Sequence, residues 1–147
     1  MTESKIAIAA DHAGFLLKEQ LKAYLISKGY TVLDFGTNSS EPTDYPEFGH
    51  KIANSIQKGE TDRGFTLCGS GNGINMTVNK YPSIRSALCW KKEIAVLARQ
   101  HNDSNICALP ARFISKEEAF EIADAFLDTK FEGGRHERRV KKISIEL

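Results

Sequence analysis

The chain has 147 residues, of which 41% are hydrophobic and 27% charged, and its formal net charge is +1. This composition is typical of one globular domain, and we expect a single domain over residues 1–147. The nearly neutral charge excludes an overall electrostatic attraction to nucleic acid or to an anionic membrane.

Neither the first residues nor the cysteines point to export or to a membrane. The N-terminal stretch lacks the pattern of a signal peptide, and no apolar run approaches the roughly 20 residues of a membrane span. The cysteines Cys68, Cys89 and Cys107 are far apart and form no CxxC pair, which favours free thiols over a disulfide framework or a zinc site. We therefore expect a cytoplasmic protein without a membrane partner.

Apolar, β-prone runs alternate with segments of helical period along the chain. The run KIAIAA at 5–10 predicts a strand, and the segment after it, with Leu17, Leu21 and Leu25 on one face, predicts a helix that ends at Gly29. Further strands are predicted at 31–36, 63–68, 84–90 and 105–110, and further helices at 46–58, 73–80, 91–100, 116–129 and after Gly134.

Strands that alternate with helices of this length imply right-handed crossovers, a parallel sheet and helices on both of its faces. The predicted fold class is therefore α/β. Ligands of such open sheets bind beyond the carboxyl ends of the strands. The loops to consider begin at Asp11, Gly69, Trp90 and Ala111.

The first of these loops carries the sequence DHAG. Asp11 can cap backbone amides where strand passes into helix, and His12 can meet an anion at the start of that helix. For Asp11 a purely structural cap and a functional role are about equally favoured. For His12 a functional role is favoured.

The loop CGSGNG, Cys68 to Gly73, follows the third predicted strand. Its glycines allow positive φ and close approach of a ligand, and successive amides can form an anion-binding concavity. The same positive potential favours the thiolate form of Cys68, which would make it a nucleophile or a base. A buried strand end followed by a simple turn is the alternative interpretation.

Familiar motifs do not fit these residues. The loop is not GxGxxG, and Ile74 and Asn75 stand where a P-loop has its GK[ST]. Ile74 also stands where a cysteine phosphatase needs arginine. HERRV at 136–140 begins like HExxH but lacks the second histidine, so no metal site is predicted.

Two segments further along complete the candidate residues. His101 and Asn102 follow the fourth long helix, and we expect them at the same edge of the sheet as Cys68 and His12, where His101 can act as a general acid or base. In the tail, Arg135 and Arg139 lie one helical turn apart and can hold a phosphate. A solvated basic face is the usual alternative, and a nucleic-acid patch is disfavoured by the missing aromatic residues.

Five segments together resemble type B ribose-5-phosphate isomerase, of the sugar-phosphate isomerase family. They are IAIAADHAGFLLK, TDYP, CGSGNGI with NK at 79–80, RQHNDSN and EGGRHERRV, in this order from Lys5 to about Ile143. The resemblance implies an α/β/α sandwich with a five-stranded parallel sheet, for which we expect the Rossmann-like order 2-1-3-4-5. It also implies a homodimer, with a tetramer as a further assembly, active sites shared at the interface, and no metal or cofactor.

The resemblance further implies conversion of ribose 5-phosphate to ribulose 5-phosphate, in the pentose phosphate pathway. Cys68 would be the base, His101 would help to open the furanose ring, and Ser70 with the amides of the loop would stabilise an enediolate. Sugar or phosphate contacts are implied for Asp11, His12, Tyr45, Gly69, Gly71, Asn72, Gly73, Asn102, Arg112, Arg135 and Arg139.

Some positions depart from the family pattern and leave alternatives open. Ser70 stands where many members have threonine, which keeps the hydroxyl, whereas Trp90 after the fourth strand is unusual and bears on substrate length. One alternative is an isomerase of a 6-phosphate hexose, such as allose or galactose 6-phosphate. The other is a non-catalytic phosphosugar-binding or thiol-sensing protein.

Overall fold

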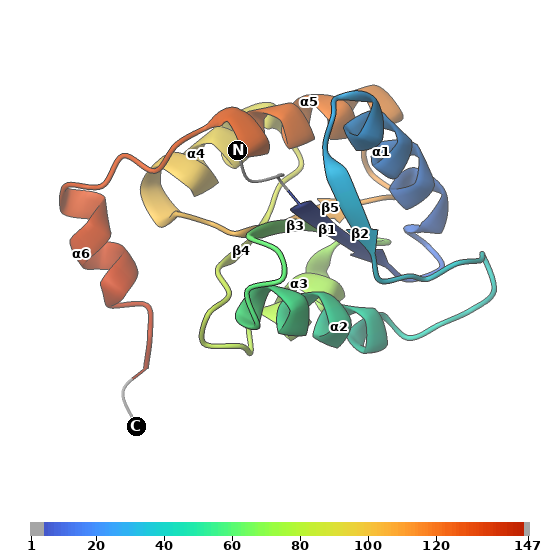
Figure 1. Ribbon diagram of the computed structural model, residues 1–147, viewed down its shortest axis with the longest axis horizontal. Helices are drawn as coiled ribbons and strands as arrows, with labels where there is room; N and C mark the ends of the chain where they lie inside the picture. Colours follow the sequence, from blue (N-terminus) through green and yellow to red (C-terminus); the bar gives the residue numbers. More distant parts are fainter. Residues whose placement is uncertain (1–4, 146–147) are drawn as a thin grey trace.

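A computed structural model describes residues 5–145. One sheet of five parallel strands lies between two layers of helices (Figure 1). The strands are β1 (Lys5–Ala10), β2 (Thr31–Asp34), β3 (Arg63–Cys68), β4 (Ser86–Leu88) and β5 (Ile106–Pro110). The helices are α1 (Phe15–Ser27), α2 (Tyr45–Gln57), α3 (Asn72–Val78), α4 (Lys92–Asn102), α5 (Lys116–Asp128) and α6 (Arg135–Lys141).

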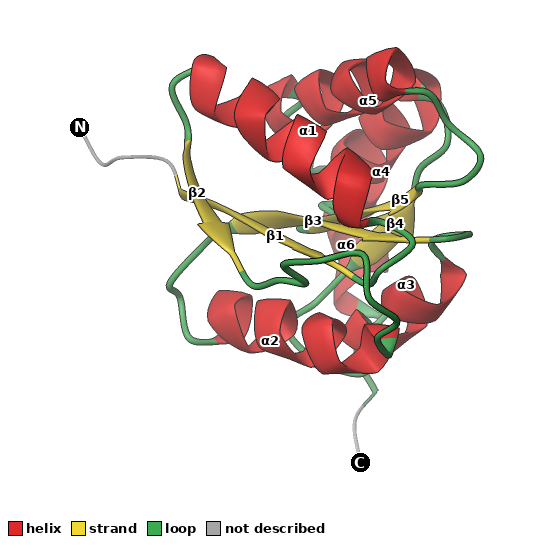
Figure 2. Cartoon of the chain, turned by 90° about the vertical axis from the view of Figure 1, so that its right-hand side faces the viewer, coloured by secondary structure: helices red, strands yellow, loops and turns green. Residues whose placement is uncertain are grey.

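The helices divide between the two faces of the sheet. Figure 2 shows α1, α4 and α5 on one face, and α2 and α3 on the other. The core divides in the same way, since Ile6, Ile8 and Ala10 of β1 pack with α1 and α5, whereas Ala7 and Ala9 pack with α2. Every second residue of a strand faces the same side, so a continuous apolar run is what a strand covered on both faces requires. The predicted α/β class is confirmed.

The strand order is β2-β1-β3-β5-β4, so the predicted order 2-1-3-4-5 is wrong at one edge. All five residues of β5 are buried, and such a strand needs a neighbour on each side. β4 has only three residues, all half-buried, which suits the outermost position. The order still reverses between β1 and β3, so the crevice at their carboxyl ends lies where it was expected.

Element ends differ from the predictions by a few residues. β2 ends at Asp34 and β4 covers only Ser86–Leu88, both shorter than predicted, whereas α4 continues through His101 to Asn102. Pro46 stands in the first turn of α2, as expected, because its missing amide donor is not needed there.

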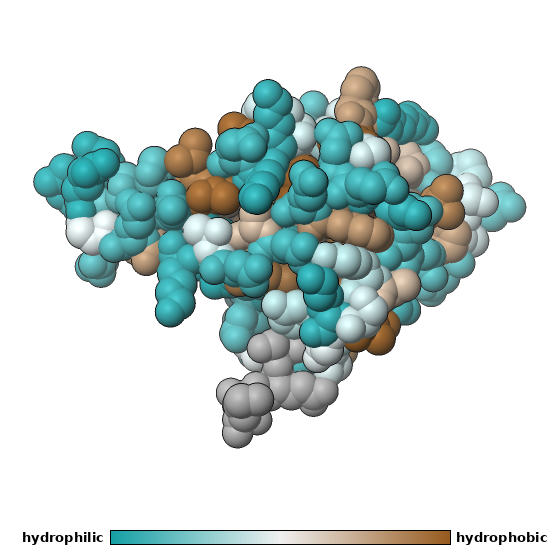
Figure 3. Space-filling view, turned by 90° about the horizontal axis from the view of Figure 1, so that it is seen from above, coloured by the Kyte–Doolittle hydropathy of each residue, from teal (hydrophilic) through white to brown (hydrophobic). Residues whose placement is uncertain are grey.

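The C-terminal helix α6 stands apart from the two helical layers, beside the end of α4 (Figure 1). Seen from above, its side of the molecule carries mainly hydrophilic side chains, and apolar side chains gather in small patches elsewhere on that face (Figure 3). Within residues 5–145 no helix has the length and apolar character to cross a membrane.

Candidate active site

The loop after β3 places Cys68 at the carboxyl edge of the sheet. Cys68 is the last residue of β3, lies opposite Pro110 of β5 and is 4% exposed. Gly71 begins α3 with a φ of +80°, a conformation that glycine adopts at little cost. The amide of Asn72 donates a hydrogen bond of 3.3 Å to Ser70 Oγ, which closes a turn within the loop.

Two predicted ligand residues lie directly over this loop. A Cβ on Gly69 would lie 3.2 Å from Arg112 Nη1, and a Cβ on Gly73 would lie 2.5 Å from the ring of Tyr45. Arg112 is held in place because its amide donates to Gly69 O at 3.0 Å. The glycines therefore let an arginine and an aromatic ring approach the backbone beside Cys68.

Asp11 lies buried at the end of β1, in the position of a cap. Its Oδ1 accepts hydrogen bonds from the amides of Ala13 at 3.0 Å and Gly14 at 3.1 Å. The amide of Asp11 donates to Leu67 O, which ties this turn to β3. The structural interpretation of Asp11 is thus confirmed for one carboxylate oxygen.

His12 is fixed by Thr43, a residue that the sequence did not single out. The His12 amide donates to Thr43 Oγ1 at 3.1 Å, and His12 Nδ1 lies 3.1 Å from the Thr43 amide nitrogen and 3.2 Å from its carbonyl oxygen. Nδ1 is engaged with Thr43 in either tautomer, which leaves Nε2 for a ligand. Because Thr43 is two residues before Tyr45, the same contacts bring Tyr45 to this edge.

His101 and Asn102 lie at the opposite edge of the sheet within one chain. They are the last two residues of α4, which leads back to Ile106, the first residue of β5. Cys68 is paired with the other end of β5. The expectation that His101 shares an edge with Cys68 and His12 is therefore wrong for a single chain, because a crossover helix must run back across the sheet before the next parallel strand begins.

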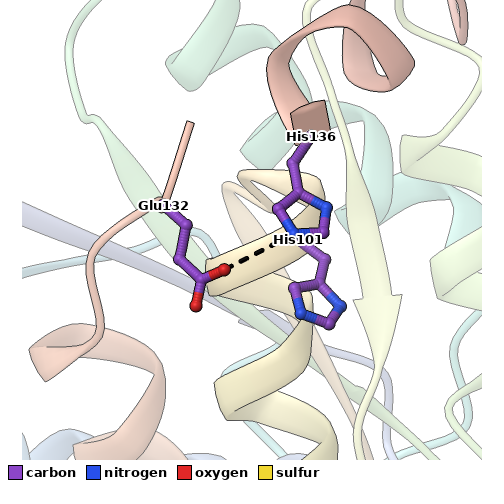
Figure 4. A group of neighbouring side chains, drawn as sticks. All are labelled: His101, Glu132 and His136. Atoms are coloured by element: carbon purple, nitrogen blue, oxygen red, sulfur yellow. Dashed lines mark ion pairs between the residues drawn. The ribbon is translucent and has the colours of Figure 1, made fainter. Parts of the chain in front are cut away.

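A second histidine lies against His101 (Figure 4). The rings of His101 and His136 are stacked, with centroids 4.2 Å apart and planes 12° from parallel. His136 Nε2 lies 3.4 Å from Glu132 Oε1. Burial, together with the nearby His101 and Arg135, lowers the pKa of His136, so its imidazole is neutral near pH 7.

Among residues 5–145, the same three residues form a cluster of possible metal ligands. One ligand atom from each of His101, Glu132 and His136 lies within 4.8 Å of the others. The two rings are nearly parallel, however, so the lone pairs of their nitrogens lie in parallel planes and do not converge on one point. As it stands, the arrangement stacks the histidines rather than directing them at an ion.

Trp90 follows β4 and lies beside α5. It is 47% exposed and lines a shallow hollow with Lys91, Glu118 and Glu121. The strand before it, β4, is separated from β3 by β5. Trp90 thus has a partner in α5, and the corrected order leaves one strand between its own strand and that of Cys68.

The candidate residues thus form two groups. One group at the carboxyl edge contains Asp11, His12, Tyr45, Cys68, Gly69, Ser70, Gly71, Asn72, Gly73 and Arg112. The other, at the end of α4 and on α6, contains His101, Asn102, Arg135 and Arg139. The sequence patterns did not indicate a role for Thr43 or Glu132. His136 stood out only as the first residue of an incomplete zinc motif.

Comparisons with known proteins match nearly the whole chain. The model of a family described as Ribose/Galactose Isomerase matches residues 6–143. Ribose-5-phosphate isomerase B of Escherichia coli is 44% identical over 140 residues, which are 95% of this chain and 94% of that protein.

Solved structures agree closely with the fold. A ribose 5-phosphate isomerase from Thermotoga maritima has a TM-score of 0.95 and 52% identity, covering 97% of this chain and 99% of that one. Ribose-5-phosphate isomerase B from Mycoplasma genitalium, with bound ribulose-5-phosphate, has a TM-score of 0.92 and 39% identity, covering 97% of this chain and 95% of that one.

Proposed function

The chain belongs to the ribose/galactose isomerase family and is an aldose-ketose isomerase, and from that premise we propose that it interconverts ribose 5-phosphate and ribulose 5-phosphate. The observation that carries this proposal is the position of Cys68, whose thiol ends β3 beside a glycine-rich loop under Arg112 and Tyr45. The reaction belongs to the pentose phosphate pathway, and no metal or cofactor takes part.

The chemistry needs a base and a set of donors in one place. Cys68 takes the proton from C2 of the open-chain aldose, exchanges it with solvent and delivers a proton to C1, while O1 and O2 carry the negative charge of the enediolate. Ser70 and the amides from Gly69 to Gly73 stabilise that charge, and donors of this kind contribute about 3 kcal/mol each to transition-state stabilisation. This assignment is supported by the position of the glycine-rich loop, whose backbone directly follows the thiol of Cys68.

The phosphate and the sugar hydroxyls supply binding energy away from the reacting carbons. His12 and Arg112 lie on the Cys68 side, where Nε2 of His12 is left for a ligand. Asp11 contacts a sugar hydroxyl through the oxygen that does not cap the turn. Arg135 and Arg139, both exposed on α6, provide the planar donors that suit a phosphate dianion.

Two chains share each active site in this proposal. His101, Asn102, Arg135 and Arg139 lie too far from Cys68 to act in their own chain, so they act on the sugar bound at the partner's Cys68. Exposed apolar side chains on the segments around the Cys68 loop support this arrangement: Leu16 at 68%, Met76 at 64% and Phe113 at 75%. Such surface is typical of an interface. A homodimer is the minimal assembly, and a tetramer would pair two of them.

A second candidate substrate is a 6-phosphate hexose, such as allose or galactose 6-phosphate. The description of the family names both ribose and galactose. The same base and the same phosphate contacts can act on a five-carbon or a six-carbon sugar phosphate. The non-catalytic alternative is set aside, because the chain belongs to a family of enzymes. The three free cysteines support a cytoplasmic location, since disulfides persist in oxidising compartments.

The deciding experiment follows deuterium at C2 of ribose 5-phosphate in ordinary water. The wild-type protein should form ketose with loss of deuterium, and Cys68→Ala and Cys68→Ser should both lose at least about a hundredfold in rate, because the base is removed. Serine is the matched control for shape, since it keeps the buried volume without a thiol. A wild type that forms no ketose rejects the pentose assignment, and an active Cys68→Ala variant rejects the base.

A further inference from the structure

His136 is a buried histidine to which the proposed mechanism gives no role. Its side chain is 8% exposed, although it belongs to α6, whose neighbouring side chains are exposed. Its Nε2 is buried without a hydrogen-bond partner, and the nearest acidic group is Glu132 at 3.4 Å. Burying a polar ring without a hydrogen-bond partner costs free energy, so we expect the buried position of His136 to serve a function.

The face of His136 restrains the ring of His101. Within residues 5–145 the His101 imidazole makes no hydrogen bond, and its defined side-chain contact is the stack with His136. The terminal torsion of a histidine side chain has a broad, two-fold preference, so a free imidazole at a helix end turns readily. The flat face of His136, 4.2 Å away and 12° from parallel, limits that rotation.

His136 is in turn held to the end of α4 by the segment before α6 (Figure 4). The Glu132 amide donates to Gln100 O at 3.1 Å, and the His136 amide donates to Gly133 O at 3.1 Å. The Glu132 carboxylate then faces His136 Nε2 from the preceding turn. Gln100 is the neighbour of His101 in α4. The backbone bond from Glu132 to Gln100 and the stack of His136 on His101 therefore both attach the segment before α6 to the end of α4.

We propose that His136 is a positioning residue for ring opening, which fixes the imidazole of His101 against the sugar. The inference rests on the proposed function, because it gives His101 a furanose to open. In that step the C1–O4 bond breaks, the C1 hydroxyl loses its proton as C1=O forms, and O4 gains a proton. One imidazole that exchanges protons with both oxygens needs a defined orientation, and displacement by about 1 Å can cost a hundredfold in rate.

Ring opening can be measured apart from the enediolate chemistry. Ribulose 5-phosphate cannot close to a five-membered ring, because the C5 oxygen that would attack its C2 carbonyl carries the phosphate. Exchange of its C1 proton with deuterated water therefore requires the base and the enediolate donors, but not ring opening. Turnover of ribose 5-phosphate requires both.

The experiment compares these two rates in the full-length protein for three variants. His136→Ala should lower kcat for ribose 5-phosphate by about tenfold or more while C1 exchange of ribulose 5-phosphate stays near wild type. His136→Phe should restore most of the turnover, because it keeps a flat ring against His101. His50→Ala is the control, since His50 is an exposed histidine on α2 that bonds Tyr81 and does not contact His101.

A nuclear magnetic resonance measurement provides a readout that does not depend on activity. The ring protons of His101 should move downfield in His136→Ala, because the shielding ring is lost, and should remain shielded in His136→Phe. Unchanged His101 resonances in His136→Ala would overturn the inference even if the wild type proved not to be a ribose 5-phosphate isomerase. Equal slowing of both rates, slowing of neither, or failure of His136→Phe to restore turnover would also overturn it.

Discussion

Cys68, at the end of β3, lies beside the last residue of β5, whereas His101, at the end of α4, comes shortly before its first residue. Cys68 is paired with Pro110, the last residue of β5, whereas His101 comes before Ile106, the first. Four steps along a strand of about 3.3 Å per residue separate these ends by about 13 Å. One chain therefore cannot bring this thiol and this imidazole to neighbouring atoms of one sugar.

This separation predicts complementation between inactive variants. Cys68→Ala and His101→Ala should each lose turnover of ribose 5-phosphate, and mixing them after reversible dissociation should restore part of it. A mixed dimer holds one site with both changes and one with neither. Turnover of the mixture, measured against each variant alone, tests the shared site.

The matched control for complementation mixes Cys68→Ala with Cys68→Ser. In that mixture each site still lacks the thiol, so no activity should return. A mixture of Cys68→Ala and His101→Ala that stays inactive, although mass spectrometry shows mixed dimers, would contradict the shared site.

Gly73 is a position where a single methyl group should damage the site directly. Its added Cβ would lie 2.5 Å from the Tyr45 ring, so Gly73→Ala must displace that ring. We expect a raised KM for ribose 5-phosphate and a loss of stability of about 1 to 3 kcal/mol, the usual cost of overpacking. Steady-state kinetics and urea unfolding measure the two effects.

Tyr45→Ala should relieve this clash. The double variant Gly73→Ala with Tyr45→Ala is therefore expected to be more stable than the sum of the two single changes predicts. Additive losses would show that the ring and the glycine do not interact.

Asp11 allows its structural and functional roles to be separated. Asp11→Asn keeps an oxygen that can accept from the amides of Ala13 and Gly14, so its stability should stay near wild type. Asp11→Ala removes the acceptor and should cost about 1 kcal/mol. If Asp11 also contacts the sugar, both variants should raise KM, and an unchanged KM in Asp11→Asn would leave only the structural role.

The buried ion pair of Lys18 with Asp34 predicts how stability depends on pH. Burial alone would raise the pKa of Asp34, but hydrogen bonds from Lys18, the Gly36 amide and Lys22 hold it below its ordinary value. The unfolded state then binds a proton more readily than the folded state, so this stability is present above the unfolded pKa and is lost as pH falls through the folded pKa.

Urea unfolding from pH 7 down to pH 3 tests this dependence. The free energy of unfolding of wild type should fall below about pH 4 more steeply than that of Asp34→Asn, whose side chain does not titrate. Lys18→Met leaves the carboxylate without its buried partner and should cost about 3 kcal/mol at pH 7. Parallel pH curves for wild type and Asp34→Asn would contradict the assignment.

Replacing Trp90 is expected not to change which sugar phosphate the enzyme prefers. β5 lies between β4 and β3, and the Trp90 side chain lines a hollow with Lys91, Glu118 and Glu121. Trp90→Ala should therefore leave the ratio of turnover on five- and six-carbon sugar phosphates unchanged. A shift in that ratio would return Trp90 to the site, through the partner subunit if the shared site is confirmed.

Much of the fold follows from local patterns in the sequence. The strands β1 and β3, buried after their first residues, and the fully buried β5 are mostly apolar runs, and the turns after β1 and β3 carry the DHAG loop and the Cys68 loop. Such features depend on periodicity and on backbone preferences that neighbouring residues set themselves. For that reason the α/β class and the carboxyl-edge loops at Asp11 and Gly69 were predicted from the sequence.

Strand order and edge placement depended on contacts between distant residues. The sequence did not distinguish β4 from β5 as the outer strand, because that choice depends on how much of each strand its neighbours bury. The edge at which His101 lies depends on α4, which runs back across the sheet to the start of β5.

The sequence by itself determined the types of residue at the site, because each motif is a short run whose chemistry is carried by its own side chains. Only the tertiary structure decided which of them meet. It placed Thr43 on His12, Tyr45 on Gly73 and His136 on His101. These contacts join residues 28 or more positions apart, and only packing of the helices and loops around the sheet brings such residues together.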